Sequence, residues 1–325
     1  MKNPMKNSMP RWALALALTL CSAAASAAWP DKPIKIIVGF PPGTTGDLIA
    51  RALAPKLSQS LGQAVVVENR TGAGSSVAAE AVARSVPDGY TLLLSTTANV
   101  INQSVSPNLK FDFTKDLAPV MLLAENPVLL VVPANSPANT LQGLIAAAKA
   151  APGKLSFASS GNGTFTHLYG ELFNQVAGIK LTHVPYRGSS QAITDVLSGV
   201  VDASFAPSTP VLSNVKAGKL KALAVIGRGR MPALPEVPTF EEGKIPGFDS
   251  ALWFGLNVPS GTPANVVEML GMQLRSALDA PDVKSQFMAQ GIQVIADGPQ
   301  KFGEQVAREN AQWARLVKAA NIQGE

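Results

Sequence analysis

The sequence predicts an α/β fold with two domains, and three observations support this prediction. At 325 residues the chain is longer than one ordinary core, which favours two domains. Its 27 glycines and 25 prolines imply many short turns. Short apolar runs alternate with amphipathic segments in the order strand, loop, helix, which is typical of largely parallel sheets and not of a helix bundle. With 46% apolar and 15% charged residues, the chain is neither a disordered protein nor a charged coiled coil.

Residues 1–27 have the form of a secretory signal peptide. They combine basic residues, an apolar run and a small-residue cleavage motif, at Lys2, Lys6, Arg11, residues 12–21 and Ala25-Ser26-Ala27. The run is too short to span a membrane, and Leu20 before Cys21 does not fit a lipidation motif. A membrane anchor and a lipoprotein are therefore the less favoured alternatives, and we expect a periplasmic protein.

Removal of this segment changes the charge and the chemistry of the chain. The segment holds three of the 27 Lys and Arg residues and none of the 22 Asp and Glu residues, so the net charge falls from +5 to +2. This balance provides no basic stripe for nucleic acid. The only Cys of the sequence is also removed, so the mature chain has no disulfide, thiol nucleophile or thiolate metal site.

The first hundred residues read as strand, loop and helix repeated three times. We expect strands at 34–38, 64–67 and 90–94 and helices at 47–61 and 77–85. Gly62 closes the first helix, and Pro55 inside it predicts a kink. Loops at the carboxyl ends of parallel strands, next to helix N-termini, are where such folds bind ligands.

The same alternation continues through a second block. We expect its strands at 128–132, 155–158, 181–184, 201–205 and 222–226, with helices at 141–150, from 164 onward and at 191–197. Residues 228–250 are rich in Pro and Gly and read as a long connection. A strand at 253–258 and two helices, at 263–280 and 299–320, complete the chain.

The loop over residues 40–47 is the most informative motif. Its backbone N–H groups and the hydroxyls of Thr44 and Thr45 precede a helix N-terminus, which is a favourable position for an anion. An ordinary strand-to-helix turn with Asp47 as the N-cap is an equal alternative. The spacing is not that of a P-loop, because no Gly-Lys-Ser/Thr follows.

A second loop, over residues 159–164, has the same chemistry in the second block. It contains two serines, a Gly-Asn-Gly sequence and Thr164 at the start of a helix. Two such loops on two domains suit one anionic ligand held between them. Each hydrogen bond from a positioned donor to a carboxylate contributes roughly 1.5–3 kcal/mol, so a few of them suffice without a buried Lys.

The remaining candidate residues argue against catalysis and against a bound metal or cofactor. His167 and His183 are the only histidines and are far apart in sequence, so a metal site is disfavoured. Gly72-Ala73-Gly74 matches a dinucleotide fingerprint only loosely, because Val77 occupies the third glycine position. No nucleophile–base pair is recognisable. Arg187, between a strand and a helix, either pairs with a ligand carboxylate or forms a surface ion pair.

Several sequence strings, taken together and in order, resemble one family. They are Trp29-Pro30, Pro33-Ile34-Lys35-Ile36-Ile37-Val38, Phe40-Pro41-Pro42-Gly43, Val66-Val67-Glu68-Asn69-Arg70 with Gly72-Ala73-Gly74, Pro87-Asp88-Gly89-Tyr90-Thr91-Leu92, His183-Val184-Pro185-Tyr186-Arg187-Gly188, Leu234-Pro235-Glu236-Val237-Pro238-Thr239, and Trp253-Phe254-Gly255-Leu256 with Gly261-Thr262-Pro263. This set resembles the Bug-type periplasmic substrate-binding proteins of tripartite tricarboxylate transporters.

The resemblance implies a two-lobed periplasmic binding protein, of the type II-like Venus-flytrap kind, with two crossover strands. It places residues 29–128 and 228–325 in lobe 1 and residues 129–227 in lobe 2. The implied function is that of a non-catalytic receptor, which binds an organic carboxylate (a di- or tricarboxylate or an aromatic acid) between the lobes and delivers it to the transporter's membrane subunits. Presentation of the ligand to a sensor kinase is the alternative, and an enzyme on the same fold is a third.

The resemblance also implies a set of ligand-binding residues. In lobe 1 they are Phe40, Gly43, Thr44, Thr45, Asp47, Thr96 and Thr97, and in lobe 2 they are Ser160, Gly161, Asn162, Thr164, His167, Arg187 and the position of Ala206. Many relatives have Gly at the position of Thr44. Many relatives also have an Asp at the position of Ala206, and that Asp can pair with an amino group of the ligand. Because Ala206 cannot, we expect a carboxylate without an amino group.

Overall fold

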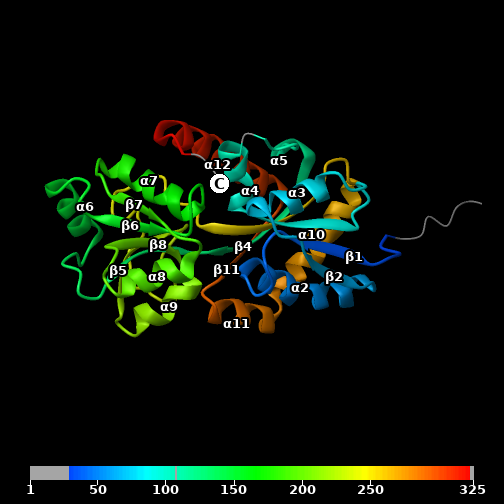
Figure 1. Ribbon diagram of the computed structural model, residues 1–325. Helices are drawn as coiled ribbons and strands as arrows, with labels where there is room; N and C mark the ends of the chain where they lie inside the picture. The colour runs from blue at the N-terminus through cyan, green and yellow to red at the C-terminus, as the bar shows by residue number, and fades with distance from the viewer. Residues whose placement is uncertain (1–28, 107, 323–325) are drawn as a thin grey trace, which may run out of the picture.

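The computed structural model describes residues 29–106 and 108–322, so the predicted signal peptide lies outside the described residues. The described chain forms two lobes side by side, each built around one β-sheet with helices on both faces (Figure 1). Within these residues no helix combines the length and the apolar character needed to cross a membrane.

The first lobe contains a six-stranded sheet in the order β11-β4-β10-β3-β1-β2. Its strands are β1 (Ile34–Val38), β2 (Val65–Asn69), β3 (Thr91–Thr96), β4 (Leu117–Asn126), β10 (Leu252–Pro259) and β11 (Gln293–Asp297). Strand β1 is parallel to β2 and β3, but β10 is antiparallel to β3 and β4, and β11 is antiparallel to β4. In this sheet parallel pairing is therefore confined to β1–β3, because β10 and β11, which follow the return of the chain from the second lobe, enter the sheet in the opposite direction.

The second lobe contains a five-stranded sheet in the order β7-β6-β8-β5-β9. Its strands are β5 (Val128–Pro133), β6 (Ser156–Ser159), β7 (Thr182–Pro185), β8 (Ala203–Pro207) and β9 (Leu220–Ile226). Strand β6 is parallel to β7 and β8, and β5 is antiparallel to β8 and β9. The pairing of β1, β2, β3 and β10 is thus repeated by β6, β7, β8 and β5.

Helices cover both faces of each sheet. They are α2 (Thr45–Leu61), the short η1 (Ala73–Ser75), α3 (Ser76–Ala83), α4 (Thr97–Val105), α5 (Phe113–Asp116), α6 (Leu141–Ala150), α7 (Phe165–Ala177), α8 (Ser189–Leu197), α9 (Ser208–Lys216), α10 (Ala264–Asp279), α11 (Pro281–Ala289) and α12 (Pro299–Ala320). Helix α2 begins at Thr45, two residues before the predicted start, and continues through Pro55. The sequence prediction missed α4, α5, α9, α11, β4 and β11.

Alternate residues of the central strands face two different cores. In β1, Ile36 and Val38 pack in a core formed with α2 and α10, whereas Ile37 packs on the opposite side in a core shared with α3 and α4. A strand that is buried on both faces has a continuous apolar sequence. This explains why the strands of the sheet centres could be recognised from the sequence.

The chain passes between the lobes twice, at residue 127 and in the segment between β9 and β10. Residues 227–251 run along the second sheet, where Thr239 forms a bridge with Val225 and the Phe240 ring stacks on Phe205 with 6.1 Å between centroids. Helix α12 packs on α4 and β4 in the first lobe and on α7 in the second. In Figure 1 this helix, drawn in red, extends over both lobes. The two crossovers and α12 therefore join the lobes.

Candidate ligand-binding site

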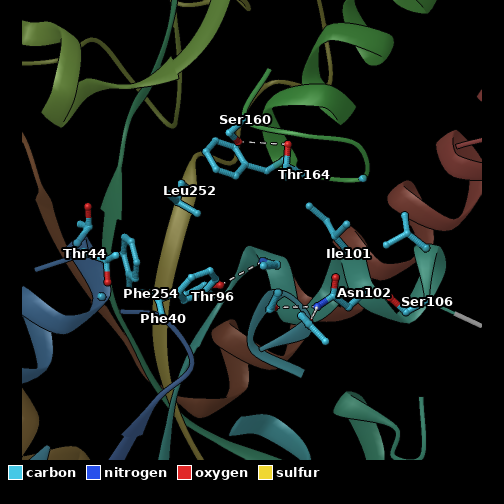
Figure 2. Close-up of a pocket in the computed structure, with 18 of the residues that line it drawn as sticks. Phe40, Thr44, Thr96, Ile101, Asn102, Ser106, Ser160, Thr164, Leu252 and Phe254 are labelled. Atoms are coloured by element: carbon cyan, nitrogen blue, oxygen red, sulfur yellow. Dashed lines mark hydrogen bonds between the residues drawn. The ribbon is translucent and has the colours of Figure 1, made fainter. Parts of the chain in front are cut away.

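A cavity of about 480 Å³ lies between the two lobes (Figure 2). First-lobe residues that line it are Phe40, Thr44, Thr45, Gly46, Ala73, Gly74, Thr96, Ala98, Ile101, Asn102, Val105, Ser106, Leu252 and Phe254. Second-lobe residues that line it are Ser160, Asn162, Gly163, Thr164 and Phe165. The first-lobe residues come from the carboxyl ends of β1, β2 and β3, from α4 and from β10. The cavity is therefore at the strand ends where α/β folds bind their ligands.

Two loops on opposite sides of this cavity have the same local geometry. In the β1–α2 loop, Gly43 has φ +83° and its N–H donates to Asp47 Oδ2 at 2.9 Å. In the β6–α7 loop, Gly163 has φ +69° and its N–H donates to His167 Nδ1 at 3.2 Å. Each glycine thus adopts a left-handed conformation and is held by the side chain four residues later.

The threonine that follows each glycine makes the same hydrogen bond in both loops. Thr44 Oγ1 donates to the Pro41 carbonyl at 2.8 Å, and Thr164 Oγ1 donates to the Gly161 carbonyl at 2.7 Å. Both threonines are N-caps, but neither side chain accepts a hydrogen bond from a backbone N–H of its own helix. The first N–H groups of α2 and α7 therefore keep their capacity to bind an anion, where the helix dipole also favours negative charge.

Asp47 holds the β1–α2 loop in place through hydrogen bonds and does not line the cavity. Its carboxylate is 2% exposed and accepts hydrogen bonds from Gly43 N, Arg51 Nε at 3.0 Å and Asn69 Nδ2 at 2.9 Å. Burial acts to raise the pKa of Asp47, but the hydrogen bonds from Arg51, Gly43 and Asn69 outweigh burial and lower it. The N-cap of α2 is Thr44, so the alternative that made Asp47 the N-cap is wrong.

His167 has the corresponding supporting position in the second lobe. Its ring stacks on His183 with 3.7 Å between centroids, and the His183 ring in turn stacks on Phe157. Burial lowers the pKa of both histidines to about 4, so the imidazoles are neutral. A neutral imidazole that accepts the Gly163 N–H at Nδ1 carries its proton on Nε2. The sequence indicated no such pair, because the two histidines are on different elements.

Thr96 and Thr97 have different positions at the end of β3. Thr96 lines the cavity and is the N-cap of α4, where its hydroxyl accepts from Ala98 N at 3.2 Å while Asn99 Oδ1 accepts from Thr96 N. Thr97 is fully buried, and its hydroxyl accepts from Trp253 N at 3.1 Å. Thr97 therefore ties α4 to β10 and does not face the cavity.

Helix α4 forms one wall of the cavity. The lining residues recur at helical spacing, at Ala98, Ile101, Asn102, Val105 and Ser106. Asn102 Nδ2 donates to the carbonyls of Ala73 and Gly74, which holds the loop after β2 against this wall. These residues were not predicted as site residues, although the apolar residues at positions 98, 101 and 105 have the spacing of one helix face.

Strand β10 supplies the floor through Leu252 and Phe254, which lie on the same side of the strand because side chains alternate. Both residues were missed as site candidates. Leu94 and the Phe254 ring also limit the size of the side chain at position 46. A Cβ on Gly46 would lie 2.9 Å from Leu94 Cδ2 and 3.5 Å from Phe254 Cε1. A small residue is therefore needed in the first turn of α2.

The predicted site residues fall into two groups. Seven line the cavity, namely Phe40, Thr44, Thr45, Thr96, Ser160, Asn162 and Thr164. Gly43, Asp47, Gly161 and His167 lie in or beneath the two loops, and Thr97 is buried behind the wall. Arg187 is exposed after β7, and Ala206 is buried within β8 beside α8 and α9; neither lines the cavity.

Among the described residues that line the cavity, none carries a charge. Hydroxyls, amides and backbone N–H groups supply its polarity, and Phe40, Ile101, Val105, Phe165, Leu252 and Phe254 supply its apolar surface. Such a lining binds a small organic anion through dipoles and packs against its carbon skeleton.

Comparison with known sequences is consistent with this geometry. Residues 49–322 match the profile of the tripartite tricarboxylate transporter family receptor. Protein BugT of Bordetella pertussis is 37% identical to this chain over 292 residues, which are 89% of this chain and 90% of BugT.

Solved structures share the whole architecture. The periplasmic binding protein BugD has a TM-score of 0.74 and 31% identity, over 91% of this chain and 100% of BugD. A Rhodopseudomonas palustris protein solved with adipate has a TM-score of 0.77 and 32% identity, over 91% of this chain and 99% of that one. MatC from the same organism, with bound malate, has a TM-score of 0.74 and 30% identity, over 89% of this chain and 100% of MatC. These similarities confirm the predicted two-lobed periplasmic binding protein fold.

Proposed function

This chain belongs to the tripartite tricarboxylate transporter receptor family, whose members are periplasmic solute receptors and not enzymes, and we propose that it captures an organic carboxylate between its lobes and delivers it to the membrane subunits of such a transporter. Relatives of the same fold hold adipate and malate, which are both carboxylates. The uncharged cavity described above can bind one carboxylate group through neutral donors.

One observation carries the proposal, namely the pair of equivalent loops that face one cavity from opposite lobes. Each loop presents the N-terminus of a helix whose threonine cap donates to its own loop, so two sets of backbone N–H groups converge on the same space. A carboxylate has two oxygens and accepts several hydrogen bonds, so both lobes can bind one carboxylate.

We propose the lobe division that the family resemblance implies, with residues 29–128 and 228–325 in lobe 1 and residues 129–227 in lobe 2, except for one segment. Residues 228–250 are proposed to move with lobe 2, because Met231, Leu234 and Val237 share a core with β5 and β9. A ligand that contacts both lobes favours the closed arrangement, since some of its contacts exist only there.

The ligand is proposed to carry no amino group. An ammonium group buried in the cavity needs a carboxylate to compensate its charge. No described residue that lines the cavity carries a carboxylate, and the buried Asp47, which does not line it, is already paired with Arg51. Residues 1–27 are proposed to be a cleaved signal peptide, in agreement with the periplasmic location of the family.

A thermal-shift screen of residues 28–325, refolded to remove co-purified ligand, tests this proposal. The panel contains citrate, malate, succinate, adipate, benzoate, nicotinate, glutamate and aspartate, with phosphate and neutral sugars as controls. Binding to the native state raises its melting temperature, so one or a few plain carboxylates should raise it and glutamate and aspartate should not. A folded protein that responds to no acid would contradict the receptor assignment, and a response to glutamate alone would contradict the absence of an amino group.

A further inference from the structure

We propose that the preferred ligand is a monocarboxylate with an apolar body and a hydroxyl at its far end, and not a diacid. This inference rests on the proposed function, because it assumes that one carboxylate binds at the two equivalent loops. The lining of the cavity continues away from those loops along α4, where the far end of the ligand meets Asn102 and Ser106.

The distance along α4 sets the length of the ligand. Asn102 is six residues beyond Thr96, which corresponds to about 9 Å along the helix axis. Figure 2 shows Thr44 and Ser106 on opposite sides of the cavity, with Thr96 between them. A benzene ring or a short alkyl chain with a group at each end spans the distance from Thr96, at the end of β3, to Asn102.

The middle of this path is apolar. Ala98 and Ile101 of α4, Phe165 of the second lobe and Leu252 of β10 line it. Ile101 is almost completely buried. A carbon skeleton gains from removal of apolar surface from water here, whereas a polar substituent would lose hydrogen bonds to water.

The far end presents an acceptor whose orientation is fixed. Asn102 Nδ2 donates to the carbonyls of Ala73 at 3.2 Å and Gly74 at 2.8 Å and lies 2.9 Å from Ser76 Oγ. Carbonyl oxygens accept only, so the nitrogen must face that loop and Oδ1 must face the cavity, as Figure 2 shows. Within the described residues no donor reaches Oδ1.

The chemistry of that acceptor selects the far group of the ligand. A ligand hydroxyl can donate to Asn102 Oδ1 and exchange a hydrogen bond with Ser106, whose hydroxyl has no partner among the described residues. A second carboxylate would face the same amide oxygen, and no described lining residue carries a positive charge to compensate. Burial of an uncompensated charge is costly, so a diacid of equal length should bind less well.

Titration calorimetry on two matched series tests the inference. One series is 4-hydroxybenzoate, benzoate and terephthalate, and the other is 6-hydroxyhexanoate, hexanoate and adipate. In at least one series the hydroxy acid should bind about threefold to tenfold more tightly than the plain acid, as expected for one net hydrogen bond, and the diacid should bind most weakly. A diacid that binds most tightly in both series would overturn the inference but not the proposed function, whereas absence of binding by every acid would count against the proposed function itself.

Two variants of Ser106 locate the far end. Ser106→Ala should reduce the affinity for the hydroxy acid and leave that for the plain acid unchanged. Ser106→Lys adds a cation at the C-cap of α4, a position that helices tolerate well, and should make the diacid the preferred ligand. Ser104→Ala and Ser104→Lys, on the same helix but outside the cavity, are the matched controls. If Ser106→Lys leaves the order of affinities for the plain acid, the hydroxy acid and the diacid unchanged, the far end of the ligand does not bind at Ser106 and the inference is overturned.

Discussion

At the scale of single residues, the two side chains that support the loops matter as much as those that line the cavity. Asp47 and His167 occupy equivalent positions, and each accepts the N–H of a glycine four residues earlier. Asp47 is ionised and paired with Arg51, whereas His167 is neutral. Both are therefore positioning residues, and neither needs to touch the ligand.

Replacement of Asp47 should weaken ligand binding without blocking the cavity. Asp47→Ala leaves the Gly43 N–H and Arg51 Nε without their acceptor, so the loop loses its fixed geometry, and we expect a loss of affinity of about tenfold or more. Asp47→Asn keeps one oxygen for Gly43 and should lose less. Titration with the acid found by the thermal-shift screen measures both variants.

Asp202→Ala is the control for this prediction. Asp202 likewise accepts a backbone N–H, from Ser156 at 2.8 Å, but it does not line the cavity. This variant should lower the melting temperature and leave the affinity unchanged. Equal affinity of wild type and Asp47→Ala for the acid would show that the geometry of the β1–α2 loop does not depend on the hydrogen bonds of Asp47.

At the scale of elements, two glycines with a left-handed backbone conformation allow an effect on the binding loop to be distinguished from an effect on overall stability. Gly43 has φ +83° and open space around the position of a Cβ, and Gly218, in a turn after α9, has φ +67° and the same open space. Substitution by Ala should therefore cost about 1–2 kcal/mol at either position through backbone strain alone.

Gly43→Ala and Gly218→Ala should differ in one respect. Both should unfold at lower denaturant concentration by similar amounts, but Gly43→Ala alone should reduce the affinity for the acid, by about fivefold or more, because its strain moves the N–H groups that bind the carboxylate. Chemical denaturation and titration calorimetry on the two variants give both quantities. Loss of affinity in Gly218→Ala to the same extent would contradict the local origin of the effect.

The sequence predicted elements where burial leaves a clear pattern and missed elements where it does not. Strand β5 is a continuous apolar run because both of its faces are buried, and β1 and β9 are apolar except for Lys35 and Lys221 at their second positions. Helix α4 contains Asn99, Asn102 and Gln103, whose polar side chains interrupt the apolar periodicity. Two of these side chains are buried and hold the loop after β2, so their role depends on tertiary contacts that no local pattern records.

The candidate site could be predicted in part for the same reason. The two loops were recognisable because glycine, threonine and serine before a helix have local consequences. Arg187 was singled out by its position between a strand and a helix and Ala206 by resemblance, and both lie outside the lining of the cavity. Leu252 and Phe254 enter the site only because the second crossover returns β10 beside β3 and β4.

At the scale of the whole molecule, an ionic cluster around the buried Glu125 joins the two crossovers. Glu125 precedes the first crossover and Arg228 follows β9 on the second, and Arg228 Nε lies 3.2 Å from Glu125 Oε1 without the alignment of a hydrogen bond. Arg228 also pairs with Asp297 of β11 at 2.8 Å. Burial raises the pKa of Glu125 to about 7, the nearby Glu309 adds to that increase, and Arg228 opposes it.

This cluster predicts a pH dependence of stability. Since the folded pKa of Glu125 is above its unfolded value of 4.5, its contribution to stability is fully present below pH 4.5 and is lost as the pH rises to about 7. Glu125→Gln removes this loss, so its stability relative to wild type should grow over that range, by at most about 3 kcal/mol. Denaturant unfolding from pH 4.5 to 8 measures the difference, and curves that remain parallel at every pH would contradict it.

The proposed function requires that an acid binds between the lobes and draws them together. Small-angle X-ray scattering of residues 28–325, with and without a saturating concentration of the acid identified by thermal shift, measures this closure. We predict a smaller radius of gyration with the acid, and no change with a neutral sugar. An unchanged radius at saturation, with binding shown independently, would contradict capture by closure of the two lobes.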